Sequence, residues 1–282
     1  MPYAYYAHGR KICSGDIAEK PANGGNRSGD DGYRKAVCRH GIYHRKIQQR
    51  CHRQRREVDY IMKLVYSDMG HILRFGEGYV PELVIENKKM FFNMVDSMAR
   101  QADGMGGDCV LSVSDRPVDF CKYADLIVQF APFEINRKSL LTKLYAALEQ
   151  KAHSADLIAK TAELLSDLER YMLELAEDYP FEISCRKLAV GSVIRALSPE
   201  VEESDQTPLE RVFSYMELVR DLDRDKLFVM VNMRSYFQDE EMELFTQSVA
   251  MHNFNVLLLE NHEATKLNYT KRFVIDGDLC EF

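Results

Sequence analysis

The side chains best suited to binding chemistry are carboxylates at the end of a predicted helix. The helix is expected over residues 155–178, and it closes with Glu174, Glu177 and Asp178. Glu174 and Asp178 share a face at four-residue spacing, where like charges repel unless a cation lies between them. Several hard oxygen ligands suit Ca²⁺ better than a transition metal. The pattern fits a calcium site or an ordinary solvated helix end, and these residues alone leave both open.

A basic face is expected on the preceding helix. Arg137, Lys143 and Lys151 fall within an arc of roughly 120° at about 100° per residue. Clustered Lys and Arg neutralise phosphates, although most such charge is simply a solvated face. This face is the densest basic helical surface that we expect in the structured part of the chain.

No catalytic constellation is visible. The tract GMGGD at 104–108 lacks the Lys and Ser/Thr that a phosphate-binding loop places after its last glycine. Two predicted strands end in Asn232 and Glu260, as the acidic strand of a nucleotide hydrolase does, and we interpret them as a relic of such a fold. No GxSxG or HExxH motif occurs. We therefore predict a protein that is not an enzyme, with a metal-dependent nucleotide hydrolase or nuclease as a less favoured alternative.

The first 61 residues differ in composition from the rest. They hold 13 Lys and Arg against 6 Asp and Glu, a net charge of +7, while residues 62–282 carry −14, and all 14 phenylalanines follow position 61. Such a polar segment cannot offset its chain entropy by burial, so we predict that 1–61 is disordered. It is interpreted as a nucleic-acid-binding arm, or as upstream DNA translated from a misassigned start with the native protein beginning at Met62. A zinc site is a weaker alternative, formed by residues without standard ligand spacing: Cys38, His40, His44, Cys51 and His52.

The spacing of the cysteines and the length of the apolar runs indicate in which compartment the protein is expected. The seven cysteines are scattered without CxxC pairs, which is typical of a reducing environment. No apolar run reaches 18 residues, and no secretory signal is visible at the N-terminus. We expect a soluble cytoplasmic protein.

The fold is predicted from alternating helical and buried-strand patterns. The apolar runs 227–231 and 256–259 each follow a helical pattern, which is typical of a mostly parallel sheet covered by helices. Thr207 with Glu210 predicts a capping box, and Asn136 is the expected N-cap of the basic helix. The helix over 155–178 carries a long apolar seam, which implies a helical hairpin or a subunit contact. Its members are Ile158, Thr161, Leu165, Leu168, Met172 and Leu175, and Leu157, Leu164 and Tyr171 widen it.

The chain from Met62 to Phe282 resembles a known family. The block KLFVMVNMRSYFQDEEMELFTQSVAMHNFNVLLLENHE, with the strand DLIVQFAPFEIN leading into a leucine-rich helical insertion, is similar to the accessory spacer-acquisition protein of type II-A CRISPR systems. The resemblance implies an α/β head, degenerate relative to P-loop nucleotide hydrolases, with an α-helical leg. The head would comprise about 62–135 and 224–282, and the leg about 136–223.

The same resemblance implies a function. Such proteins form homotetrameric rings, bind calcium, accept double-stranded DNA ends without known catalysis, and act with the CRISPR integrase proteins and the RNA-guided nuclease in antiviral defence. By position, the calcium ligands would be Glu174, Asp178 and Glu182, with Glu177 as a further candidate. The DNA-facing residues would be Arg137, Lys138, Lys143 and Lys151. A protein–protein adaptor that never touches DNA is the alternative.

Overall fold

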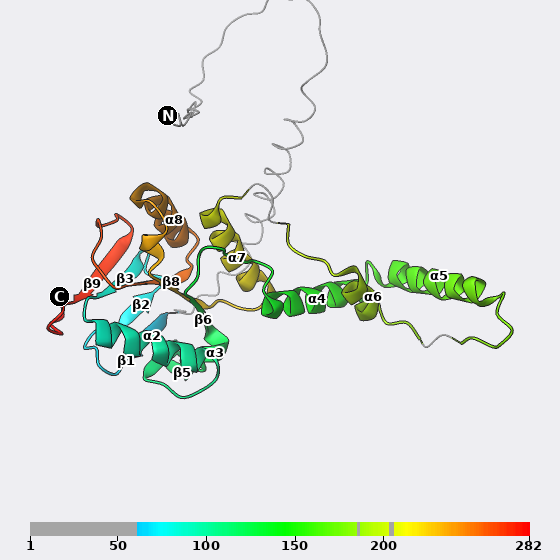
Figure 1. Cartoon of the computed structure of the whole chain (residues 1–282), viewed down its shortest axis with the longest axis horizontal. Helices are drawn as coiled ribbons and strands as arrows, with labels where there is room; N and C mark the ends of the chain where they lie inside the picture. Colours follow the sequence, from blue (N-terminus) through cyan, green and yellow to red (C-terminus); the bar gives the residue numbers. More distant parts are fainter. Residues whose placement is uncertain (1–60, 185–186, 203–205) are drawn as a thin grey trace, which may run out of the picture. The chain divides into compact units, whose positions relative to one another are not determined.

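A five-stranded, wholly parallel sheet forms the centre of the computed structural model, which describes residues 61–184, 187–202 and 206–282 (Figure 1). In spatial order its strands are β6 (Ala124–Ile127), β7 (Leu227–Val231), β8 (Asn255–Glu260), β3 (Val80–Ile85) and β9 (Thr270–Ile275). The prediction of an α/β fold on a mostly parallel sheet is confirmed.

Both faces of this sheet are buried, which explains the uninterrupted apolar runs. In β7, Leu227 and Val229 contribute to one hydrophobic cluster, while Phe228 and Met230 contribute to a second. Successive side chains of a strand point to opposite faces, so a strand covered on both sides must be apolar throughout.

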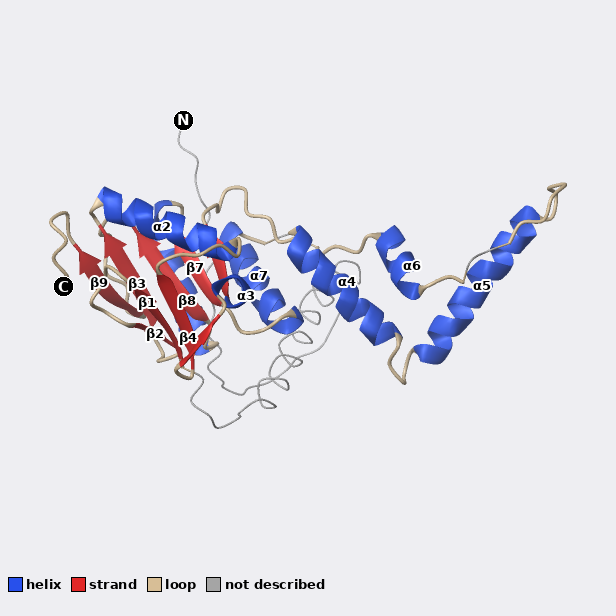
Figure 2. Cartoon of the chain, turned by 90° about the horizontal axis from the view of Figure 1, so that it is seen from below, coloured by secondary structure: helices blue, strands red, loops and turns tan. Residues whose placement is uncertain are grey.

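A smaller antiparallel sheet and one helix supply the first of these two clusters. In spatial order the strands of this sheet are β2 (Leu73–Phe75), β1 (Met62–Tyr66), β4 (Cys109–Val113) and β5 (Arg116–Val118). Helix α2 (Lys88–Ala102) buries Met90, Met94 and Met98 in the same cluster and lies along the strands in Figure 2. The strand patterns of β1 and β2 are visible in the sequence, but their membership of a separate antiparallel sheet is not.

The second cluster is closed by α7 (Pro208–Leu222), α8 (Asp239–Met251) and the start of α4 (Lys138–Ala152). The capping box of α7 is confirmed, since Thr207 accepts from the Glu210 backbone and Glu210 accepts in return. The predicted N-cap of α4 is wrong, because Arg137 occupies that position. Asn136 instead exchanges two hydrogen bonds of 2.9 and 3.0 Å with the Val201 backbone, a partner 65 residues away.

The remaining helices follow α4. Helix α4 contacts α6 (Val190–Leu197) and α7, whereas α5 (Ile158–Ala176) contains no buried residue. The division into a head and a leg at 136–223 stays a prediction. Helix α7 lies within the predicted leg, but its buried residues belong to the second hydrophobic cluster, beside the parallel sheet. Within the described ranges no helix is long and apolar enough to cross a membrane.

The sequence interpretations of residues 1–61 concern a segment that, apart from Ile61, lies outside the described residues. The disorder, the nucleic-acid-binding arm, the misassigned start and the zinc ligands therefore stay predictions.

Candidate functional site

Arg137 fixes the start of α4 against the parallel sheet. Its Nη1 lies 3.7 Å from Oδ1 of Asp125 in β6, and its guanidinium carbon lies 4.6 Å from the centroid of the Tyr215 ring in α7. The Tyr215 hydroxyl donates to the other oxygen of Asp125 at 2.5 Å. Burial, followed by the charge of Asp125, raises the pKa of Tyr215, so this hydroxyl stays protonated and continues to donate. These contacts give Arg137 a structural role, because they hold the start of α4 against β6 and α7.

Lys143 makes a second contact between α4 and the end of α7. Its ammonium group pairs with Asp223, which lies just after α7 and also accepts from Lys226 at 3.2 Å. Burial acts to raise the pKa of Asp223, but the hydrogen bonds from Lys143 and Lys226 outweigh it and the pKa is lowered. Two of the four residues predicted to face DNA are thus engaged by carboxylates of their own chain.

Lys138 and Lys151 are exposed and pair with no described acidic residue. They are separated by 13 positions along α4. At 100° and 1.5 Å per residue they lie roughly 140° apart around the axis and about 20 Å apart along it. One copy of the chain therefore presents these two lysines as separate points of charge, and not as one basic face.

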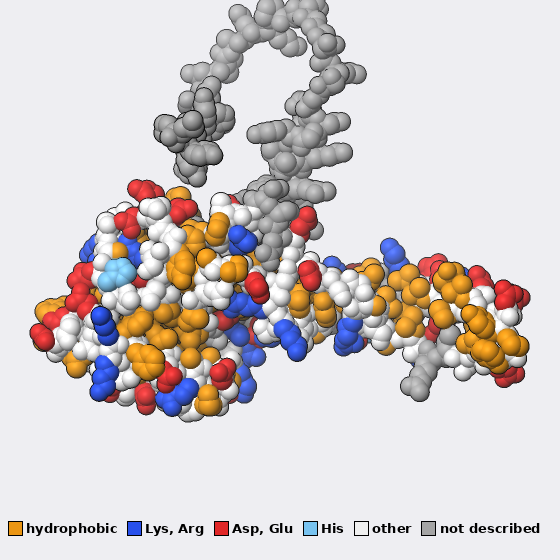
Figure 3. Space-filling model, viewed as in Figure 1, with side chains coloured by type: hydrophobic (Ala, Val, Ile, Leu, Met, Phe, Trp, Pro, Cys, Tyr) orange, Lys and Arg blue, Asp and Glu red, His pale blue; other side chains and the backbone are white. Residues whose placement is uncertain are grey.

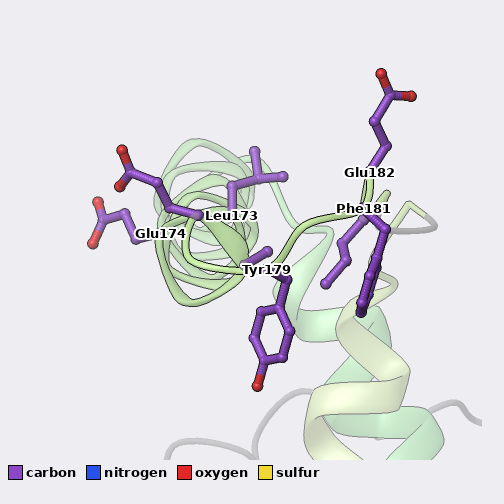
Figure 4. A pocket seen from close by; sticks show the side chains of 8 residues that line it. Leu173, Glu174, Tyr179, Phe181 and Glu182 are labelled. Carbon is purple, nitrogen blue, oxygen red and sulfur yellow. The ribbon is translucent and has the colours of Figure 1, made fainter.

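The acidic residues at the end of α5 do not converge on one point. In Figure 4 the carboxylates of Glu174 and Glu182 point away from each other on opposite sides of a shallow hollow. Among the described residues, no group of three or more His, Cys, Asp or Glu side chains lies close enough to hold a metal ion. Glu174, Glu177, Asp178 and Glu182 therefore do not fit a calcium ion as they are placed here, and calcium binding stays a prediction.

The apolar seam of α5 is exposed. Figure 3 shows hydrophobic side chains gathered over this helix. Five members of the seam are each about half exposed, and these are Ile158, Leu164, Tyr171, Met172 and Leu175. Patches of this kind mark surfaces that associate with another molecule.

A buried ion network, which sequence reasoning missed, lies near the carboxyl ends of β7 and β8. Glu82 of β3 is completely buried and accepts from two arginines, Arg234 at 2.7 Å and Arg272 at 2.9 Å. Arg234 follows β7 and also donates to Asp239 at 2.7 Å. The sequence signal for it was a glutamate inside an otherwise apolar strand, VPELVI, which requires a cationic partner.

Glu260 closes this network at the end of β8. One carboxylate oxygen accepts from the Arg234 backbone N–H at 3.1 Å, and the other has no hydrogen-bond partner among the described residues. Burial raises the pKa of Glu260 to about 7, and the nearby carboxylate of Glu82 adds to the effect.

The start of α2 is capped by a side chain of the turn that precedes it. Only Glu86 and Asn87 separate β3 from α2, and Asn87 Oδ1 accepts from the Met90 backbone N–H at 3.0 Å. This cap takes the amide that an anion would use at a helix N-terminus.

The sequence of the chain matches the model of a known protein family. The model described as "CRISPR-associated protein (Cas_Csn2)" matches residues 101–279, which is more than half of the chain. The chain is 24% identical over 139 residues to the CRISPR-associated protein Csn2 of Enterococcus faecalis. This alignment covers 48% of the chain and 62% of the relative, so the chain spans less than two thirds of that relative's length.

Solved structures resemble the chain more distantly. The crystal structure of Stu0660 of Streptococcus thermophilus superposes with a TM-score of 0.49 at 9% identity, covering 77% of this chain and 75% of that one. The ADP conformation of MJ1267, an ATP-binding cassette of an ABC transporter, gives a TM-score of 0.40 at 9% identity, covering 78% and 89% of the two chains.

Proposed function

This chain belongs to the Csn2 family of CRISPR-associated proteins, and on that premise we propose that it binds double-stranded DNA ends as a homotetrameric ring, without catalysis, during spacer acquisition. Its partners in this proposal are the CRISPR integrase proteins and the RNA-guided nuclease, in the cytoplasm. The match of the family model over residues 101–279 is the observation that carries the proposal.

The exposed seam of α5 supports self-association. A helix that leaves Leu164, Met172 and Leu175 about half exposed gains stability when a second copy covers them. Several copies would also bring together the separate charges of Lys138 and Lys151, which single chains present far apart.

Charge opposes DNA binding by a single copy. Residues 62–282 carry a net charge of −14, and phosphate contacts supply most of the nonspecific affinity of a protein for duplex DNA. Calcium, as the resemblance implies, would lower this repulsion, but no ligands are assigned because the four predicted carboxylates do not converge. No step of the proposal depends on a placed ion.

An adaptor that binds only proteins is the second candidate. It is favoured by the pairing of Arg137 with Asp125 and of Lys143 with Asp223, because both basic side chains are already occupied.

Gel-shift titration separates the two candidates. The purified protein is titrated against one duplex in linear and in covalently closed circular form, each with Ca²⁺ and with a chelator. The proposal predicts tighter binding to linear DNA, with weaker binding in the chelator and at higher salt. Equal affinity for the two forms would argue against loading from ends, and no binding to either form would favour the adaptor.

A further inference from the structure

The hollow at the end of α5 combines exposed aromatic side chains with carboxylates that pair with no residue of the described part of the chain. It has a volume of about 450 Å³ and lies between the last turns of α5 and the segment that follows. Its apolar part is formed by Leu173, Tyr179, Phe181 and Ile183, and its acidic part by Glu174, Glu177 and Glu182.

Two aromatic rings form the apolar part that is most accessible. Tyr179 is 57% exposed and Phe181 is 63% exposed, and their ring centroids lie 5.6 Å apart (Figure 4). Rings at this spacing pack against each other, which restricts the rotation of both side chains. A partner that binds them therefore causes only a small further loss of conformational entropy. Exposed aromatic pairs of this kind are typical anchors of protein–protein contacts.

The carboxylates determine which partner suits these rings. Glu174, Glu177 and Glu182 make no ion pair with any described residue, and in Figure 4 Glu174 and Glu182 lie on different sides of the aromatic pair. An apolar centre inside a charged rim selects a partner that has an apolar side chain flanked by opposite charge. A phosphate backbone would be repelled by the same three groups.

The hollow borders the apolar seam of α5. Of its lining residues on α5, Ala176 lies four positions after the seam residue Met172, whereas Leu173 lies roughly 100° around the helix axis from Met172. The two aromatic rings of the hollow belong to the segment that follows α5 and are not members of the seam.

We propose that this hollow binds a cationic protein segment in which one large apolar side chain, flanked by Lys or Arg, packs on Tyr179 and Phe181. The flanking cations pair with Glu174, Glu177 and Glu182. These glutamates thus serve a protein contact in place of the calcium site predicted from sequence. The proposal does not depend on DNA binding, and it fits the full chain in any state of assembly that leaves the hollow open.

Fluorescence anisotropy with a defined peptide tests the proposal. The probe is a labelled twelve-residue peptide with a central Leu flanked by Lys and Arg, and its two controls replace the Leu by Gly or every cation by Glu. We expect the probe to bind the full chain about tenfold more tightly than either control peptide. Equal binding of the three peptides, or no binding of the probe, would overturn the proposal.

Matched variants then locate the contact. The variant Glu174→Gln/Glu177→Gln/Glu182→Gln is compared with Glu163→Gln/Asp167→Asn/Glu240→Gln, which removes three exposed carboxylates elsewhere. We expect about a tenfold loss of peptide affinity in the first variant and little change in the second. The exposed pair Tyr179→Ser/Phe181→Ser should lose at least as much, with circular dichroism confirming the fold.

Two outcomes would contradict this assignment. Equal losses in the two carboxylate variants would show a nonspecific charge effect. A change in oligomeric mass in the hollow variants, without peptide binding by the wild type, would show that a second copy occupies the hollow. Calcium titration of the same variants adds a third check, because stoichiometric binding of Ca²⁺ that Glu174→Gln/Glu177→Gln/Glu182→Gln abolishes would return these residues to a metal site.

Discussion

The guanidinium of Arg234 donates to the carboxylate of Glu82 at 2.7 Å, and each side chain is only 1% exposed. Arg272 donates to the same carboxylate, and Arg234 also pairs with Asp239. The network joins β3, β9 and the segment after β7, so three separate parts of the chain depend on one buried charge cluster. Removing Glu82 takes away the one buried counter-charge and leaves Arg234 in a low-dielectric environment with Asp239 as its remaining ion pair.

The substitution Glu82→Gln should therefore lower the free energy of unfolding by about 3–5 kcal/mol, because Arg234 and Arg272 lose the buried counter-charge that they share and keep only the exposed Asp239 and Glu263. Urea denaturation followed by circular dichroism measures this. The exposed pair Arg170–Asp167 provides the control, and Arg170→Gln should cost about 0–1 kcal/mol. Similar small losses in both variants would show that the buried network contributes little.

Glu260 should make stability depend on pH. Its pKa is raised to about 7 in the folded chain from an ordinary value of 4.5, so the folded state binds more protons than the unfolded state between these values. Its contribution is present below pH 4.5 and is lost as the pH rises to 7, by roughly 3 kcal/mol. The stability of the wild type relative to Glu260→Gln should fall across this window, as measured by urea denaturation at several pH values.

The exposed Glu240→Gln is the control for the removal of one carboxylate. A difference between wild type and Glu260→Gln that stays constant from pH 4.5 to 7 would contradict the raised pKa.

The lysines of α4 should separate into two functional groups. Lys138→Gln/Lys151→Gln should weaken binding to linear duplex, and the slope of log K on log salt should become shallower by about 1 for each phosphate that the variant no longer neutralises. Lys143→Gln should instead lower the free energy of unfolding, since Asp223 loses a partner. Gel shifts at several salt concentrations measure the first effect and thermal denaturation the second.

Lys266→Gln, in an exposed loop, is the control for the loss of one positive charge. Equal weakening of DNA binding by Lys266→Gln and by the α4 double variant would show that α4 has no special role.

The central strands were predictable because burial on both faces is a local pattern. The run at 227–231 coincides with β7, and the run at 256–259 lies within β8. The N-terminal part of β3 was not predictable, since Pro81 is unfavourable inside a sheet and Glu82 is a charged residue in a buried strand. Glu82 is tolerated because its partners Arg234 and Arg272 come from 152 and 190 positions away, and Pro81 precedes the residues that pair with β8.

The candidate sites were predictable as charge patterns but not as contacts. Periodicity correctly predicted the helix α4, yet the pairing of Arg137 and Lys143 with Asp125 and Asp223 depends on where α7 and β6 pack. The carboxylates at the end of α5 share a helical face in sequence terms, but Glu182 follows the helix end and points elsewhere.

A substitution in the apolar seam of α5 tests whether this surface is buried in an oligomer. Met172→Glu places a charge in the middle of the exposed apolar surface, and it should dissociate any oligomer that buries this seam. Glu163→Gln on the same helix is the control, and its oligomeric mass should equal that of the wild type.

Light scattering coupled to size-exclusion chromatography is the most direct measurement of the proposed ring. The account predicts a wild-type mass near four subunits of 32.6 kDa and a smaller mass for Met172→Glu. A mass of one subunit for the wild type, with Ca²⁺ and with linear duplex present, would contradict it.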